Sequence, residues 1–193
     1  MAQTHHCSAP ESLGEKISKT DWLDLALVAS IDGTAHLDAP SYAVWTHLSR
    51  SAARSNLRCE IVLIGRNLSE QASKLTAVGA DRVFVYDADT LEASAAALEA
   101  FCVDYKPTVL AFPSDLRELA EALAARIHRV TAALYDGSFE LNRAKDLCLP
   151  EDAPERERVT STRPQLVVCK PDLTPVALET EQAPLPELFI CCP

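Results

Sequence analysis

Short apolar runs alternate with helical segments along most of this chain, and that alternation limits the folds open to it. The runs are 25–31, 60–65, 82–86, 108–112 and 165–169. Each has the length of a strand and little polar alternation, which is typical of strands buried on both faces. Parallel strands need long crossovers, and helices supply them. The chain is therefore predicted to be an α/β protein, with a three-layer parallel sheet that has helices on both faces.

The segments between the apolar runs predict helices with recognisable ends. Pro40 suits the first turn of a helix, and Gly79 suits the end of one that starts at Leu68. Thr90 is expected to cap a third helix that runs to Tyr105, and Ser114 or Asp115 a fourth. The expected helices are 40–52, 68–78, 90–105 and 116–127.

The pattern changes after Arg129. Short strands are expected at Val130–Leu134 and Ser138–Leu141, joined as a hairpin around Asp136-Gly137. The segment 172–193 is rich in proline and is expected to be an extended tail, whose apolar residues 185–190 dock on a partner or on the domain itself. This gives an N-terminal extension at 1–22, a domain at 23–171 and a C-terminal tail at 172–193.

Composition excludes several classes of protein. The 193 residues suit one ordinary domain with tails, and 48% hydrophobic residues can form a core. A net charge of −10 argues against a nucleic-acid partner, which requires a basic face. No apolar run is long enough to span a membrane, and residues 1–20 have no secretory signal. A cytoplasmic location is expected.

The seven cysteines do not predict a metal centre, because no CxxC spacing is present. Cys59, Cys102 and Cys169 lie in or beside apolar runs, where a cysteine acts as a small hydrophobe. Cys191-Cys192 near the C-terminus has open interpretations: an exposed thiol pair, a lipid or metal attachment, or part of a frayed tail.

Open parallel sheets bind ligands at the carboxyl ends of their strands. Three of the candidate residues at these ends have two interpretations each. Asp32 is either part of the site or part of a solvated turn. Ser114 and Asp115 are either helix caps or the mark of a helix N-terminus that holds an anion. No GxGxxG or P-loop pattern follows any strand, and no catalytic or metal-binding residue is predicted. The candidate cofactor-binding residues at these ends are Ser30, Asp32, Gly33, Gly65, Pro113, Ser114 and Asp115.

Arg117–Ile127 (RELAEALAARI) is the most specific of several segments that carry a family resemblance. In their order along the chain, these segments resemble the N-terminal domain of the electron-transfer flavoprotein α subunit, in which the matching helix is similar to RDLAPRLAARL. Others are 106–110 (KPTVL), similar to KPDVVL, and 77–83 (AVGADRV), similar to the family's GADKV junction. The later segments 130–139 and 165–171 are similar to the family's DVTAL…DG…F element and to its KVVTVRP strand.

Two departures from the family pattern matter. The glycine-rich approach to the fourth helix is replaced by residues 113–116 (PSDL), and the second arginine of the helix by Ala122. The family's FAD-binding domain would follow the last strand, where only residues 172–193 remain. We expect this shortness to be natural. The resemblance implies the fold of the adenine nucleotide α-hydrolase-like group without flavin binding by this chain alone.

The resemblance implies an electron-transfer-flavoprotein-like subunit or scaffold, without catalytic activity of its own. Its partner would be a β-type or flavin-bearing subunit, or a second copy in a homodimer, and FAD or AMP would be shared with that partner. The alternatives are an adenine-nucleotide-binding regulatory module that takes AMP or ATP, and a structural protein whose site has decayed.

Overall fold

The structure is a computed structural model, and it describes residues 4–7, 25–32, 34, 36–72, 75, 79–128, 134–137, 140–141, 147–154, 156–169 and 187–191. Its centre is an eight-stranded sheet in the order β1-β10-β4-β3-β2-β5-β9-β6, and every neighbouring pair in that sheet is parallel. The strands are β1 (Thr4–Cys7), β2 (Leu25–Ala29), β3 (Cys59–Ile64), β4 (Arg82–Tyr86), β5 (Val109–Phe112), β6 (Leu134–Asp136), β9 (Gln165–Val168) and β10 (Glu187–Cys191).

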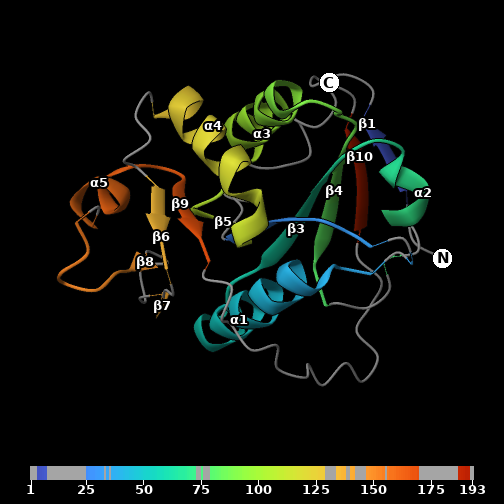
Figure 1. Cartoon of the computed structure of the whole chain (residues 1–193). Coiled ribbons are helices and arrows are strands. Elements are labelled where there is room, and N and C mark those ends of the chain that lie inside the picture. The colour runs from blue at the N-terminus through green and yellow to red at the C-terminus, as the bar shows by residue number, and fades with distance from the viewer. Residues whose placement is uncertain are drawn as a thin grey trace.

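Helices cover both faces of this sheet, which confirms the predicted three-layer arrangement (Figure 1). One face packs against α1 and α2, and the other against α3 and α4. A 3-10 turn, η1, directly precedes α4, and α5 lies near the β6 edge. The helical elements are α1 (Ala39–Ser55), α2 (Leu68–Ala72), α3 (Leu91–Tyr105), η1 (Ser114–Leu116), α4 (Arg117–Ile127) and α5 (Arg156–Ser161).

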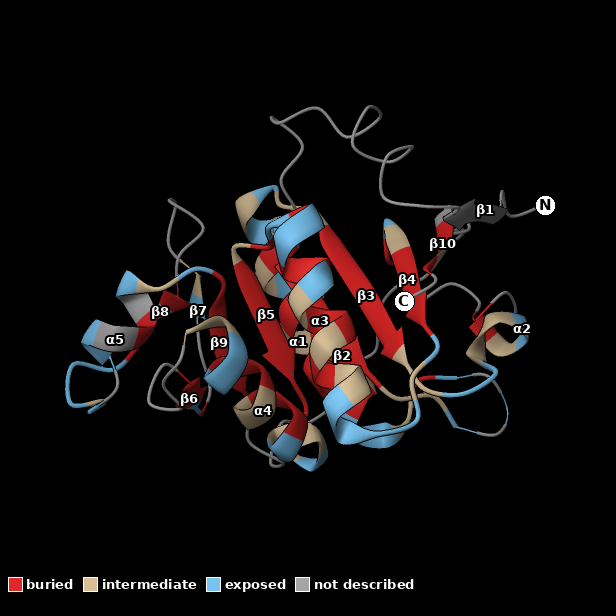
Figure 2. Cartoon of the chain, turned by 90° about the horizontal axis from the view of Figure 1, so that it is seen from above, coloured by how far each residue is buried: buried red, intermediate tan, exposed pale blue. Residues whose placement is uncertain are grey.

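The central strands are buried on both faces, as their apolar runs predict. Alternate residues of a strand point to opposite faces, so Leu25 and Leu27 of β2 pack on the α1 side while Ala26 and Val28 pack on the side of α3 and α4. Figure 2 shows the result, with buried β2, β3 and β5 at the middle of the molecule and many exposed residues on the outer surfaces of the helices and in loops.

Both ends of the chain add a strand to the sheet. β10 lies between β1 and β4, and β1 forms the edge. The sheet therefore includes residues from the segments 1–22 and 172–193 that the sequence analysis placed outside the domain. Of the two docking alternatives for the apolar residues 185–190, residues 187–190 pack on the domain itself. Cys191 is buried, so the exposed-thiol and frayed-tail interpretations are wrong for it; Cys192 lies outside the described residues.

The predicted hairpin after the fourth helix is wrong. Leu134–Asp136 joins the main sheet as β6, parallel to β9, because its apolar residues are buried there. Glu140–Leu141 forms β7 and pairs with β8 (Leu147–Cys148) in a separate two-stranded sheet. The expected residues 130–133 and 138–139 lie outside the described ones.

The helix ends follow the sequence in part. Thr90 caps α3, accepting a hydrogen bond from the Ala93 N–H at 3.1 Å. Neither Ser114 nor Asp115 caps α4 with its side chain, because η1 takes up both residues before α4 begins. Within the part of the chain that the structure describes, no helix combines the length and apolar character needed to cross a membrane.

Candidate functional site

The order of the strands reverses between β2 and β5, and a pocket lies there. From β2 the chain proceeds outward through β3 to β4, and then returns to place β5 on the other side of β2. The segments that follow β2 and β5 therefore lead away in opposite directions. In open α/β sheets this switch point, at the carboxyl ends of the strands, is where ligands bind.

The pocket has a volume of about 250 Å³, and polar and apolar side chains both line it. It lies on the side of the sheet covered by α3 and α4, beside the first turns of both helices. Its polar residues are Ser30, Ser94, Asp115 and Glu118. Its apolar residues are Val28, Ala29, Ile64, Leu91, Leu116 and Leu119.

Ser30 is held at the end of β2 by the start of α1. Its N–H donates to Ser41 Oγ at 2.9 Å, and its carbonyl accepts from the Asp38 N–H at 3.1 Å. Asp38 in turn caps α1, accepting from the Ser41 N–H at 2.8 Å. These hydrogen bonds thus hold both the start of α1 and Ser30, which lines the pocket.

The charged residues of the pocket are acidic. Asp115 and Glu118 are exposed carboxylates within about one turn of each other, at η1 and the first turn of α4. Partial burial raises the pKa of Asp115, and the nearby carboxylate of Asp38 raises it further. The positive end of α4, which would otherwise favour an anion, thus faces two carboxylates that repel one.

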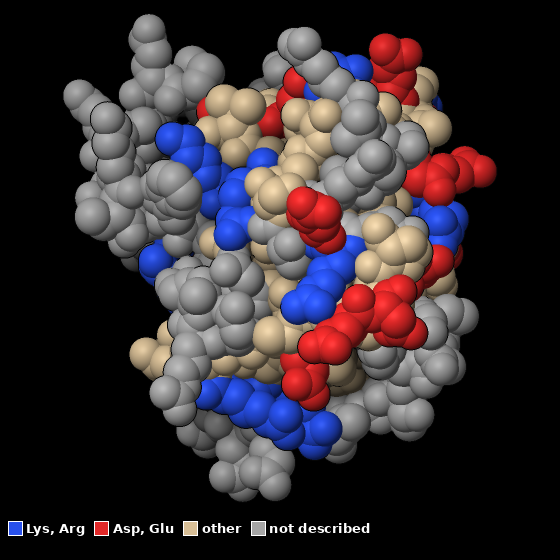
Figure 3. Space-filling model, turned by 90° about the vertical axis from the view of Figure 1, so that its left-hand side faces the viewer, with Lys and Arg blue, Asp and Glu red and all other residues tan. Residues whose placement is uncertain are grey.

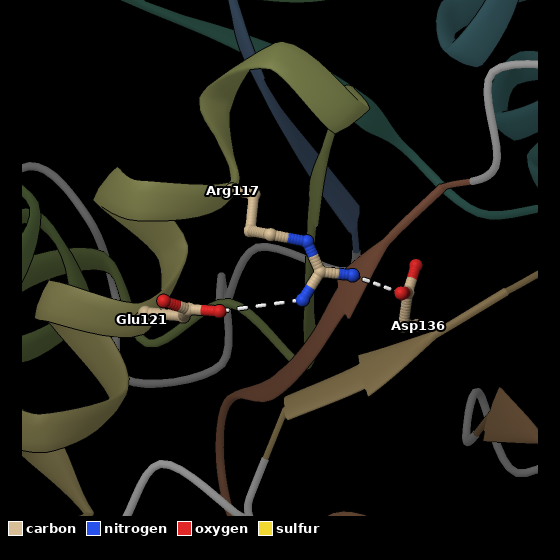
Figure 4. Close-up of polar contacts among 3 residues, drawn as sticks. All are labelled: Arg117, Glu121 and Asp136. Atoms are coloured by element: carbon tan, nitrogen blue, oxygen red, sulfur yellow. Dashed lines mark hydrogen bonds and ion pairs between the residues drawn. The ribbon is translucent and has the colours of Figure 1, made fainter.

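The arginine at the start of α4 makes its contacts outside the pocket. Arg117 forms an ion pair through Nη2 with Asp136 at the end of β6, and another through Nη1 with Glu121 at 3.3 Å (Figure 4). It is not among the residues that line the pocket. The guanidinium therefore ties α4 to β6, and the pocket lining contains no basic side chain.

Of the predicted site residues that the structure describes, Ser30 and Asp115 line the pocket. Asp32 lies in a turn, where its Oδ1 accepts from the N–H groups of Thr34 and His36 at 2.8 and 3.0 Å. These hydrogen bonds lower its pKa, led by the one from His36. This geometry agrees with the solvated-turn interpretation.

Gly65, Pro113 and Ser114 also lie outside the pocket lining. The Gly65 N–H donates to the Tyr86 carbonyl at 3.1 Å, so this glycine belongs to the junction between β3 and β4. Pro113 precedes η1, and Ser114 begins it. Gly33 lies outside the described residues. The candidate residues from the sequence thus follow the carboxyl ends of several strands, and two of them, Ser30 and Asp115, line the pocket.

Sequence reasoning missed the residues that α3 and α4 contribute, among them Leu91, Ser94 and Glu118. Thr90 does signal that a helix starts near the carboxyl edge. However, the side of the sheet that α3 covers depends on the crossover direction from β4 back to β5, which no local pattern records. Leu91 lines the pocket although its side chain is 49% exposed, so it does not belong to the buried apolar pattern by which the core residues are predicted.

Neither serine of the pocket lies beside a lining histidine or lysine that could act as a base. Among the described residues, no three His, Cys, Asp or Glu side chains are grouped closely enough to hold a metal ion. No family model matches this chain, and no curated protein matches it.

Proposed function

We propose that this chain is an electron-transfer-flavoprotein-like subunit that acts as a scaffold, with the flavin held by a partner chain. The doubly wound fold agrees with that proposal. Two segments of the resemblance also meet in space: Arg117 opens the most specific one, and its partner Asp136 belongs to another (Figure 4). This ion pair gives the resembling residues a common structural purpose, the attachment of α4 to β6.

The observation that carries the scaffold function is the acidic pocket at the switch point. FAD and adenine nucleotides are polyanions, and sites for them place N–H groups and basic side chains around phosphate. Here Asp115 and Glu118 occupy that position. The volume of about 250 Å³ also lies below the roughly 300–1,000 Å³ of ordinary small-molecule sites. These features favour cofactor binding by another chain.

The charge distribution near the β6 edge is compatible with a protein partner. Figure 3 shows that acidic and basic side chains lie interspersed among the described residues of this face. Mixed charge of this kind gives a surface that can fix the orientation of a partner without attracting polyanions.

The first test is ligand binding by the purified chain. FAD, AMP and ATP at about 1 mM should leave the melting temperature unchanged. A site with a Kd near 10 μM would raise it by roughly 5–10 °C. A cooperative melting transition in the same samples serves as the control for folding. A shift with AMP or ATP would favour the nucleotide module instead, and a shift with FAD would place the flavin on this chain.

The second test is isolation of the tagged chain at its natural level of expression. We expect a complex of fixed stoichiometry that shows visible flavin absorption, with the flavin lost when the partner is removed. Arg117→Ala, which breaks the bridge to Asp136, should weaken the complex if β6 and α4 form its interface, and Arg126→Ala is the matched control on the same helix. Recovery of the chain without any flavoprotein would favour a structural protein with a decayed site.

A further inference from the structure

The two strands nearest the chain ends lie side by side and bring two cysteines into register. β1 and β10 are parallel, and Cys7 is paired with Cys191 at their carboxyl ends. On its other side β10 pairs with β4, where Cys191 is opposite Tyr86. A row of three register positions, Tyr86, Cys191 and Cys7, therefore runs to the edge of the sheet.

The backbone spacing suits a covalent bond between the two cysteines. Neighbouring strands lie about 4.8 Å apart, and register partners occupy the same face of a sheet. Disulfides join residues whose Cα atoms are roughly 4.4–6.8 Å apart. The positions of Cys7 and Cys191 meet this requirement without a change of strand register.

The surroundings of Cys191 fix its position. It is 7% exposed and belongs to the core on the side of α3 and α4. Its side chain shares a hydrogen bond with that of Tyr86, which, after burial, contributes to raising the pKa of Tyr86. Of the described cysteines, Cys59, Cys102 and Cys169 are also buried. Cys59 is in register with Leu25, Cys102 lies within α3, and the Cys169 N–H donates to the Phe112 carbonyl, so none of these backbone pairings joins two cysteines.

We propose that Cys7 and Cys191 form a thiol–disulfide pair that joins the two chain ends when a disulfide oxidant such as oxidised glutathione is present. The Cys7 thiolate attacks the glutathione disulfide, which gives a mixed disulfide and releases one glutathione thiolate. The Cys191 thiolate then attacks the Cys7 sulfur and releases the second. The protein loses two protons and two electrons, and one glutathione disulfide becomes two glutathione thiols.

The position of β1 explains how the oxidant reaches the pair. Among the described strands, β1 lies at the edge and pairs with β10 alone, so opening it breaks a single ladder of the hydrogen bonds described. Exchange therefore starts on Cys7, and reclosure of β1 brings the mixed disulfide back to Cys191. The link fastens the N-terminal strand to the C-terminal one.

The test is peptide mapping of the intact chain after incubation with oxidised glutathione. Cleavage after glutamate separates residues 1–11 from 188–193. We expect these two peptides to be recovered joined, and to separate on reduction. Cys191→Ser should abolish the link, whereas Cys192→Ser, and Cys148→Ser at an exposed position on β8, should leave it intact.

Other outcomes would overturn the proposal. These are a link that survives in Cys191→Ser and is lost in Cys192→Ser, a Cys191–Cys192 bond inside the C-terminal peptide, or glutathione retained on Cys7 alone. If Cys191→Ser does not fold, Cys7→Ser at the edge strand provides the second variant. Oxidation should raise the melting temperature of the natural chain by roughly 5–10 °C and leave that of Cys7→Ser unchanged.

Discussion

At the scale of single residues, Glu60 is the least expected feature of this protein. It lies on a central strand with its side chain fully buried, and neither carboxylate oxygen has a hydrogen-bond partner among the residues that the structure describes. Its ion-pair partner is Arg82 on the neighbouring strand, whose Nε is 3.8 Å from Oε1. Burial raises the pKa of Glu60 to about 7, although the charge of Arg82 lowers it in part. Near pH 7 the buried carboxyl group of Glu60 is therefore divided between its protonated and ionised forms.

This pKa predicts how stability depends on pH. Because the folded-state value is raised from 4.5 to about 7, the contribution of Glu60 to stability is present at acidic pH and is lost as the pH rises through 7. One pKa unit is worth about 1.4 kcal/mol, so the loss from this carboxyl is about 3 kcal/mol. Glu60→Gln cannot ionise and should not show it. Urea denaturation between pH 5 and 8 should therefore show the variant gaining stability relative to the natural chain as the pH rises.

The exposed Glu118→Gln is the control for that experiment, and its stability should follow the natural chain at every pH. Parallel curves for the natural chain and Glu60→Gln would show that Glu60 stays ionised throughout and that Arg82 compensates its burial in full.

At the scale of elements, α3 and α4 cover the same face and pack against each other, but they begin differently. α3 has a side-chain cap at Thr90, whereas α4 follows Leu116, which makes no such hydrogen bond. The network of Asp38, Ser41 and Ser30 gives α1 a third kind of start, which is tied to a strand. The three helices thus begin with different local hydrogen bonds.

Thr90→Ala should lower the free energy of unfolding by about 1 kcal/mol, because the Ala93 N–H loses its acceptor. Thr90→Ser keeps a hydroxyl at this position and should lie within a few tenths of a kcal/mol of the natural chain. Equilibrium urea denaturation of the three proteins measures both. Equal losses for Ala and Ser would show that the threonine methyl group matters and the cap does not.

The sequence was a good guide to elements and a poor guide to their partners. Apolar runs predicted β2, β3, β4, β5 and β9 within a few residues, because burial on both faces leaves a local record. β6 was assigned to a hairpin because Asp136-Gly137 is a strong turn signal, while its parallel pairing with β9 depends on residues 32 positions later. The pocket was half predicted for the same reason: Ser30 and Asp115 follow strands, but Ser94 and Glu118 enter through helix packing.

At the scale of the whole molecule, the sheet is completed by segments from opposite ends of the chain. β10 is the strand that covers β4, and without it the apolar residues of β4 would lie at an edge. Phe189 of β10 stacks on Phe84 with ring centroids 5.1 Å apart, and Phe84 in turn contacts Phe101 and Tyr105 of α3. The C-terminal strand is therefore part of the main aromatic core.

This packing predicts that Phe189→Ala destabilises the whole protein. Phe189 is 8% exposed, and truncation of a buried phenylalanine costs about 3–5 kcal/mol because it removes apolar contacts and leaves a cavity. Val103→Ala on α3, where the side chain is 65% exposed, should cost less than about 0.5 kcal/mol. Phe189→Leu should recover part of the loss.

The transition of Phe189→Ala should remain a single step by both far-ultraviolet circular dichroism and tryptophan fluorescence, because Trp45 lies fully buried on the opposite face of the same sheet. A variant that loses little stability, or one that loses circular dichroism before the fluorescence changes, would show that β10 folds independently of the rest.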